Sequence, residues 1–245
     1  MTRKTFAVKE PKAARGTPVR VGLREDVRAY KREVILKAAI DVFYSDGYQT
    51  ATVDDVAALI SMTKAAVYYY FKSKEALLTA IIERCSDLTL QAIERGIATG
   101  DSPPKRLALA CFCFAAMVLE NQKMIALYFR EERCFPAALR ERVNATEKSV
   151  TTKLSRVIES GMRLGSFRQC DAQLLALNVT GMISMAFYWY AEHGRMPNMD
   201  LCRYFASEAL FFAGFKGDSQ LEDWVRELPA AAAMPPAHRG LAGQF

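Results

Sequence analysis

Residues 52–71 read TVDDVAALISMTKAAVYYYF, and this stretch decides the fold of the chain. Two short apolar patterns with helical spacing flank the tripeptide SMT. Thr52 and Thr63 stand where a side-chain oxygen can cap a helix N-terminus, so the spacing predicts helices over about 53–60 and 64–70. Two short helices joined by so tight a turn are the helix-turn-helix signal, in which the second helix lies in the major groove of DNA.

The second of these helices ends in three consecutive tyrosines, Tyr68, Tyr69 and Tyr70. Successive residues of an α-helix diverge by about 100°, so the three rings must point in different directions. With Val67 and Phe71 directed inward, at least one ring is expected to pack on the neighbouring helices. The others can then present hydroxyl groups to phosphate oxygens.

The start of the same helix carries small side chains between two positive charges. Ala65 and Ala66 would allow a close approach to the groove and methyl contact with thymine, and Lys64 and Lys74 place a positive charge at each edge. Short amphipathic helices and aromatic runs also occur in ordinary helical cores. At this point a plain structural interpretation therefore stands beside DNA binding.

The rest of the chain also shows helical spacing, and no convincing β-alternation or internal repeat. Further helices are predicted over about 25–45, 74–97, 105–120, 123–132, 136–163, 171–192 and 200–214, with a short amphipathic piece at 220–228. The predicted fold class is therefore all-α. The predicted divisions are a basic disordered arm (1–22), a three-helix helix-turn-helix domain (23–72), a second helical domain (73–216) and a C-terminal extension (217–245).

The net charge of +6 over 245 residues is concentrated near the start of the chain. Residues 1–20 hold six basic side chains against the single acidic Glu10. Such an arm is either a solvated, disordered terminus or a source of phosphate contacts that strengthen DNA binding without reading sequence.

Cysteine and histidine usage argues against catalytic, metal and disulfide chemistry. The six cysteines lie mostly in apolar runs without the regular spacing of a disulfide scaffold, and Cys111 and Cys113 have no histidine nearby. His193 and His238 belong to no nucleophile or metal pattern. We expect no metal, no cofactor and no catalytic residue, so the chain is not expected to be an enzyme.

The first twenty residues lack the apolar segment of a signal peptide, which predicts a cytoplasmic protein. Residues 174–191 carry no charge over 18 positions, close to the lower length of a membrane span. Ala176, Thr180 and Ser184 recur at four-residue steps and form a small-residue strip. A buried interface helix is therefore favoured over a membrane helix.

The N-terminal pattern resembles that of the TetR family of transcriptional regulators, over about fifty residues. The family pattern joins an apolar first helix, "aA..lF...G", to "T..dIA..aGvs.gtlY.yF.sKe.L". The residues that meet it are Ala38, Ala39, Phe43, Gly47, Thr52, Val56, Ala57, Thr63, Val67, Tyr68, Tyr70, Phe71, Ser73, Lys74, Glu75 and Leu77. Ser61 and Ala65 depart from it, because the family commonly has glycine at both positions.

This resemblance implies a role for each polar residue of the motif. Thr52, Thr63, Tyr68, Tyr69 and Lys74 would hold phosphates, while Lys64, Ala65 and Ala66 would face the bases. The alternatives are that the threonines are only helix caps and that Lys74 is a solvated charge. The resemblance further implies a homodimer in which the helices near 171–192 and 200–214 pair, a palindromic operator, and an effector that lowers DNA affinity.

An apolar effector pocket is expected in the second domain, with Phe114, Met117, Met185 and Trp189 in its walls. The segment YFREERCFP (128–136) looks like those of TetR regulators that sense acyl-coenzyme A thioesters, whose phosphates Arg130 and Arg133 would hold. Another hydrophobic effector, or no effector, stays open, and the two arginines can instead pair with nearby acids. The contrasting function is a helical lipid- or thioester-handling enzyme, or an adaptor protein without DNA binding.

Overall fold

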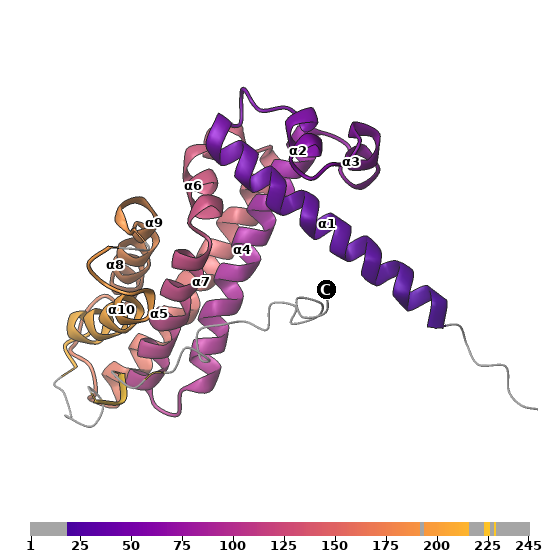
Figure 1. Ribbon diagram of the computed structural model, residues 1–245. Coiled ribbons are helices and arrows are strands. Elements are labelled where there is room, and N and C mark those ends of the chain that lie inside the picture. Colours follow the sequence, from indigo (N-terminus) through magenta and orange to yellow (C-terminus); the bar gives the residue numbers. More distant parts are fainter. Residues whose placement is uncertain (1–18, 192–193, 216–222, 226–227, 229–245) are drawn as a thin grey trace, which may run out of the picture.

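The computed structural model describes residues 19–191, 194–215, 223–225 and 228, and within these ranges it contains helices and no strand (Figure 1). The predicted all-α fold is confirmed. The helices are α1 (Val19–Asp46), α2 (Val53–Leu59), α3 (Lys64–Tyr70), α4 (Lys74–Thr99), α5 (Pro103–Glu120), α6 (Gln122–Arg130), the 3₁₀ turn η1 (Glu132–Cys134), α7 (Ala137–Arg163), α8 (Ala172–Ser184), α9 (Ala186–Trp189) and α10 (Asn198–Phe212).

Parts of the predicted termini lie outside the described residues. This holds for residues 1–18 of the predicted arm and for most of the predicted extension at 217–245. Of the predicted 220–228 piece, residues 223–225 are described and helical, and residue 228 is described. The first helix begins at Val19, so residues 19–22 of the predicted arm belong to α1.

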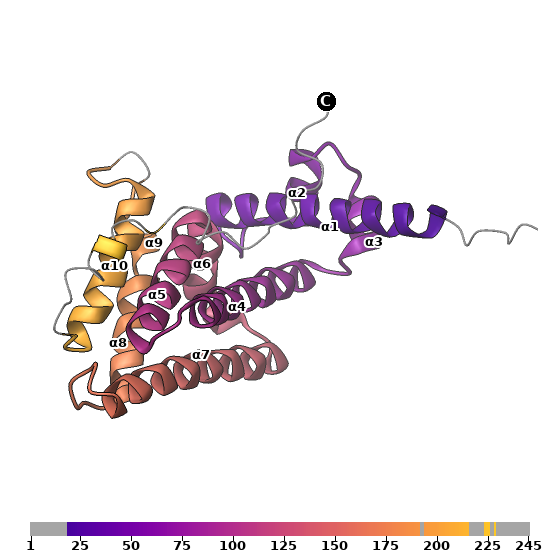
Figure 2. The same ribbon diagram turned by 90° about the horizontal axis from the view of Figure 1, so that it is seen from below.

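Helix α2 packs on α1 and α3 packs on α2, and together they form a small head at one end of the molecule (Figure 1). Its core contains Phe43, Val56, Val67 and Phe71, all at most 3% exposed. The N-terminal half of α1 projects away from the rest of the protein, as the perpendicular view in Figure 2 also shows. These residues continue into the core of the body, because α4 and α6 both pack against α1.

The body is arranged around α5, which packs against α4, α7, α8 and α10. Each residue from Leu107 to Leu119 is at most 6% exposed, as expected for a helix that is apolar on all sides. The helices α8, α9 and α10 lie on the side of the body remote from α3 (Figure 1). This order places the head and the α8–α10 layer at opposite ends of the protein.

The helix predicted over 171–192 is interrupted, so the prediction of a single helix there was wrong. Helix α8 ends at Ser184, and the chain turns at Met185 into the four-residue α9. The turn lets Phe187 stack on Phe129 of α6, with ring centroids 5.3 Å apart and planes at 7°. Among the described residues no single helix is long and apolar enough to cross a membrane, and α5 and α6 meet that test only together, with an 87° bend between them.

Candidate nucleic-acid interface and effector cavity

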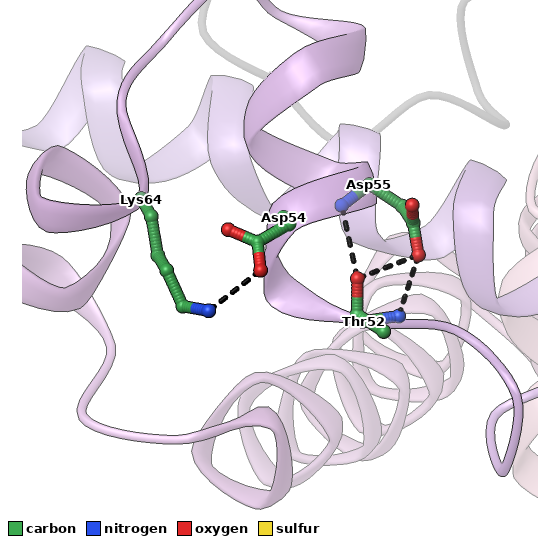
Figure 3. Close-up of polar contacts among 4 residues, drawn as sticks. All are labelled: Thr52, Asp54, Asp55 and Lys64. Carbon is green, nitrogen blue, oxygen red and sulfur yellow. Dashed lines mark hydrogen bonds and ion pairs between the residues drawn. The ribbon is translucent and has the colours of Figure 1, made fainter.

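The N-terminus of α2 is held by a reciprocal cap between Thr52 and Asp55 (Figure 3). The Asp55 amide donates to Thr52 Oγ1 at 3.2 Å, and the Thr52 amide and hydroxyl donate to Asp55 Oδ2 at 2.8 and 2.7 Å. These hydrogen bonds from Thr52 lower the pKa of the Asp55 carboxyl. Thr52 is therefore a helix cap in the free protein, and its hydroxyl proton is already engaged with Asp55.

The turn between α2 and α3 contains a backbone conformation that favours glycine. Ser61 has φ +53°, the left-handed region, while its amide donates to the Ala58 carbonyl at 3.1 Å. A residue with a Cβ atom is strained in this region by about 1 kcal/mol or more. Serine thus makes the turn, at an energetic cost that glycine would avoid.

Replacing Ser61 with glycine is expected to raise the free energy of unfolding by about 0.5 kcal/mol. The relief of left-handed strain exceeds the extra backbone entropy that glycine loses on folding by roughly that amount. Urea unfolding followed by circular dichroism measures the difference. A lower stability for Ser61→Gly would mean that the serine side chain supports the turn.

The first turn of α3 is open to solvent. Thr63 caps it by accepting a hydrogen bond from the Ala66 amide at 3.2 Å. Thr63, Lys64 and Ala65 are exposed, Ala66 is half-buried and Val67 is fully buried. The predicted base-facing residues therefore lie together at the solvent-facing N-terminus of α3, the part of a recognition helix that meets base edges.

The three tyrosine rings differ in exposure, because they point in different directions around α3. Tyr69 is 62% exposed, whereas Tyr68 and Tyr70 are partly buried and pack against the core. The guanidinium carbon of Arg28 in α1 lies 5.8 Å from the centre of the Tyr69 ring. Arg28 thus adds a positive charge beside the exposed phenol, and nothing in the local motif points to this residue because it lies 41 positions upstream.

Lys64 is not a free charge in the unbound protein. Its Nζ atom lies 2.6 Å from Asp54 Oδ2, and this hydrogen bond raises the pKa of the Lys64 ammonium. Figure 3 shows the pair bridging the start of α3 and the start of α2. Both side chains are more than half exposed, so the pair contributes little to stability, and Lys64 can exchange Asp54 for DNA.

Replacing Asp54 with alanine is expected to raise the affinity for non-specific duplex DNA by about 3- to 10-fold at low salt. The change removes a carboxylate from the surface near the DNA and releases the Lys64 ammonium. Fluorescence anisotropy with a labelled random duplex measures the affinity. Asp87→Ala removes the same charge from an exposed position on α4 and is expected to leave the affinity within about 2-fold of wild type.

Lys74 lies at the junction of head and body, in a role that neither sequence interpretation anticipated. Its Nζ atom donates to the carbonyl oxygens of Tyr48, Gln49 and Ala51 at 2.6, 3.0 and 3.0 Å. All three ammonium protons have a protein partner, so Lys74 fastens the loop between α1 and α2 to the start of α4. Phosphate binding by Lys74 stays a prediction, and it would require this side chain to give up a carbonyl.

A cavity of about 330 Å³ lies between α4, α5, α6, α7 and α8. Phe114 and Met185, two of the predicted pocket residues, line it together with Ile125, Phe129 and Val150. Polar groups also reach it, chiefly threonine hydroxyls and the carboxylate of Glu147. The lining is thus mainly apolar with a few polar groups, which is the usual composition of a small-molecule site.

The other four predicted ligand residues do not line this cavity. Met117 is 2% exposed within the packing of α5, and Trp189 is 56% exposed because the turn into α9 carries it outward. Arg130 lies on the ring of Tyr44 in α1, 4.9 Å from its centre, and Arg133 is exposed in η1. The two arginines lie at the C-terminal end of α6 and just beyond it.

The cavity offers binding rather than catalysis. Cys85 is the one thiol among the described residues that line it, and burial raises the pKa of this thiol to about 12, so it stays protonated and is a poor nucleophile. In the part of the chain that the structure describes, no group of three or more histidine, cysteine, aspartate or glutamate side chains is placed to hold a metal ion.

Two family models match the chain. The model for "Bacterial regulatory proteins, tetR family" matches residues 35–81, and the model for "Tetracyclin repressor-like, C-terminal domain" matches residues 100–211. Among curated proteins, the uncharacterized HTH-type transcriptional regulator YhgD of Bacillus subtilis (strain 168) is 25% identical over 168 residues, covering 66% of this chain and 86% of that protein.

Solved structures share the architecture. A bacterial regulatory protein in the tetR family from Rhodococcus RHA1 is 26% identical with a TM-score of 0.70, covering 76% of this chain and 98% of that one. AibR in complex with isovaleryl coenzyme A and operator DNA is 22% identical with a TM-score of 0.63, covering 72% and 96%. At 22% identity, the similarity to AibR shows a shared fold only.

Proposed function

Because the chain belongs to the TetR family of bacterial regulatory proteins, whose two models together match more than half of it, we propose that it is a repressor that an apolar effector releases from a palindromic operator. The chain is a helix-turn-helix transcriptional regulator and not an enzyme. The observation that carries the proposal is the exposed first turn of α3, where Lys64 and Ala65 face solvent. A cytoplasmic location, with access to chromosomal DNA, belongs to the proposal.

A homodimer is proposed from the apolar surface of the α8–α10 layer. On α8 the exposed residues Leu174 and Leu177 lie three positions apart and share one face, and Met185 and Tyr188 are exposed at the turn that follows and on α9. Tyr204 and Phe211 recur seven residues apart on α10 and are 49% and 73% exposed. An apolar surface of this extent is typical of a protein interface, and a second copy is the occupant that gives a two-fold protein for a two-fold operator.

Signalling from the cavity to the head is proposed to pass through α6. One side of α6 lines the cavity with Ile125 and Phe129. Its other side contacts α1, through the ion pair of Lys123 Nζ with Asp41 Oδ1 at 2.5 Å and the contact of Arg130 with Tyr44. An effector that displaces α6 would therefore move α1, and with it the spacing of the two recognition helices.

Acyl-coenzyme A thioesters remain the first effector class to test. AibR, which shares this fold, was crystallised with isovaleryl coenzyme A and operator DNA, and the cavity walls described above suit an acyl chain. Neither Arg130 nor Arg133 lines the cavity, so any contact of these residues with the coenzyme A phosphates would lie outside it.

The test is a selection of binding sites from random duplex DNA with the purified protein, followed by gel shift of the enriched duplex. We expect a palindromic sequence that binds two protomers, and isovaleryl and octanoyl coenzyme A are the first compounds to test for its release. If no sequence is enriched and no duplex is shifted even at low salt, where phosphate contacts are strongest, the DNA-binding role is overturned.

A further inference from the structure

The cavity contains several hydroxyl groups whose protons are already used. Thr89, Thr146, Thr151 and Thr180 each donate to the carbonyl oxygen four residues earlier in their own helix, at 2.9, 3.1, 3.0 and 2.9 Å. A hydroxyl group has one proton and two lone pairs. Where one of these four oxygens reaches a ligand, it can therefore only accept a hydrogen bond, unless the intrahelical bond is broken.

Tyr128 and Glu147, which also line the cavity, likewise offer hydrogen-bond acceptors. The Tyr128 hydroxyl donates to Glu147 Oε1 at 2.6 Å, so the phenol oxygen is also left as an acceptor. Burial, with Glu147 as its neighbour, raises the pKa of Tyr128, which keeps the phenol protonated and the hydrogen bond in place. The second oxygen of the Glu147 carboxylate adds a negative charge to this group of acceptors.

No positive side chain balances that charge within the cavity. Its described lining includes no lysine, arginine or histidine, and only Ser86 and Ser184 have hydroxyls for which no bond is assigned. Glu147 is exposed as well as lining the cavity, so it stands at the rim, where a ligand enters. A ligand that brings only acceptors, above all a carboxylate, would face the Glu147 charge and, apart from the two serine hydroxyls, oxygens whose protons are already used.

We infer that the effector of this regulator has an apolar body and a polar end that donates hydrogen bonds, and that Glu147 selects it. This inference rests on the proposed function, since it assigns an effector class to the proposed effector cavity. A primary ammonium group fits best, because a charge-assisted hydrogen bond to a carboxylate is stronger than a neutral one. An alcohol fits less well, and a coenzyme A thioester meets the requirement only through the amide N–H groups of its pantetheine arm.

The experiment compares three ligands with the same hydrocarbon body. Isothermal titration calorimetry with the full-length protein at neutral pH measures the affinity for octylamine, octanol and octanoate. We expect octylamine to bind about 10-fold more tightly than octanol, and octanoate to bind at least about 100-fold more weakly than octylamine. Equal binding of octanoate and octylamine, or no binding of any of the three, overturns the inference.

Two variants test whether the preference for octylamine comes from the Glu147 carboxylate or from the apolar lining of the cavity. Glu147→Gln keeps the shape and the acceptor and removes the charge, so the advantage of octylamine over octanol is expected to fall about 10-fold while octanol stays within about 3-fold of wild type. Glu159→Gln makes the same change at an exposed position of α7 outside the cavity and is expected to change neither affinity. An unchanged octylamine affinity in Glu147→Gln contradicts the assignment.

Binding of the enriched duplex to the same preparations distinguishes the two proposals. If the duplex is bound but the three octyl ligands do not show the expected order of affinity, the effector class is wrong and the DNA-binding role is retained. If octylamine binds more tightly than octanol and octanoate but no duplex is bound, the ligand preference of the cavity is retained and the DNA-binding role is wrong.

Discussion

Replacing Gly96 with alanine is expected to lower the free energy of unfolding by about 3 kcal/mol, the upper end of overpacking costs in a well-packed core. A Cβ atom at this position would lie 2.3 Å from the amide nitrogen of Ala110, 2.4 Å from its Cα and 2.5 Å from the carbonyl carbon of Leu109. All three are backbone atoms of α5, so no side chain can turn aside. The two helices would have to separate at this contact.

Urea unfolding followed by circular dichroism measures this effect, with Gly181→Ala as the matched change. Gly181 is also helical, but no atom of a neighbouring element lies within 4 Å of the place that a Cβ atom would take in the single chain, so alanine there should stabilise α8 by up to about 1 kcal/mol. A Gly96→Ala protein within about 1 kcal/mol of wild type would mean that α4 and α5 do not approach so closely. A loss of stability in Gly181→Ala would instead place a second copy against that position.

Replacing Ala65 with glutamate is expected to lower the affinity for the selected operator by at least about 100-fold, without unfolding the head. Ala65 is exposed in the first turn of α3, so a carboxylate there would face base edges and phosphates. An acidic residue in the first turn of a helix is favourable for the helix itself, because it meets the positive end of the helix dipole. The loss of binding would therefore come from the interface and not from folding.

Ala138→Glu is the control for this prediction. Ala138 is the second residue of α7, as Ala65 is of α3, and it is also exposed, but it lies in the body. Gel shift of the enriched duplex is expected to leave Ala138→Glu within about 3-fold of wild type. Retained operator binding by Ala65→Glu would show that α3 does not enter the groove by its first turn.

The sequence predicted those parts of the fold that local chemistry determines. The bounds of α3, 64–70, follow from the cap Thr63 and the buried Val67, and the structure has the same bounds. The all-round burial of α5 follows from its uninterrupted apolar composition. In both cases residues close together in the chain hold the whole signal.

Features that depend on contacts between distant segments could not be predicted. The chain turns at Met185 as Phe187 packs on Phe129, almost sixty residues away. Lys74 is occupied by three carbonyls of an earlier loop, and Arg130 by the ring of Tyr44. Both lysine and arginine can serve as phosphate ligands, so residue type alone could not distinguish these structural contacts from a binding role.

The position of α8 has a consequence for how the protein would respond in a cell. Leu177 and Met185 line the cavity and are at the same time 48% and 47% exposed on the face assigned to a second copy. Helix α8 and the turn at its end would then contribute to both the cavity lining and the dimer interface. Effector binding and dimerisation would therefore be thermodynamically linked. The apparent potency of an inducer would depend on the concentration of the regulator in the cell. The inducer concentration needed for release would differ between a cell with a few copies of the regulator and a cell that overproduces it.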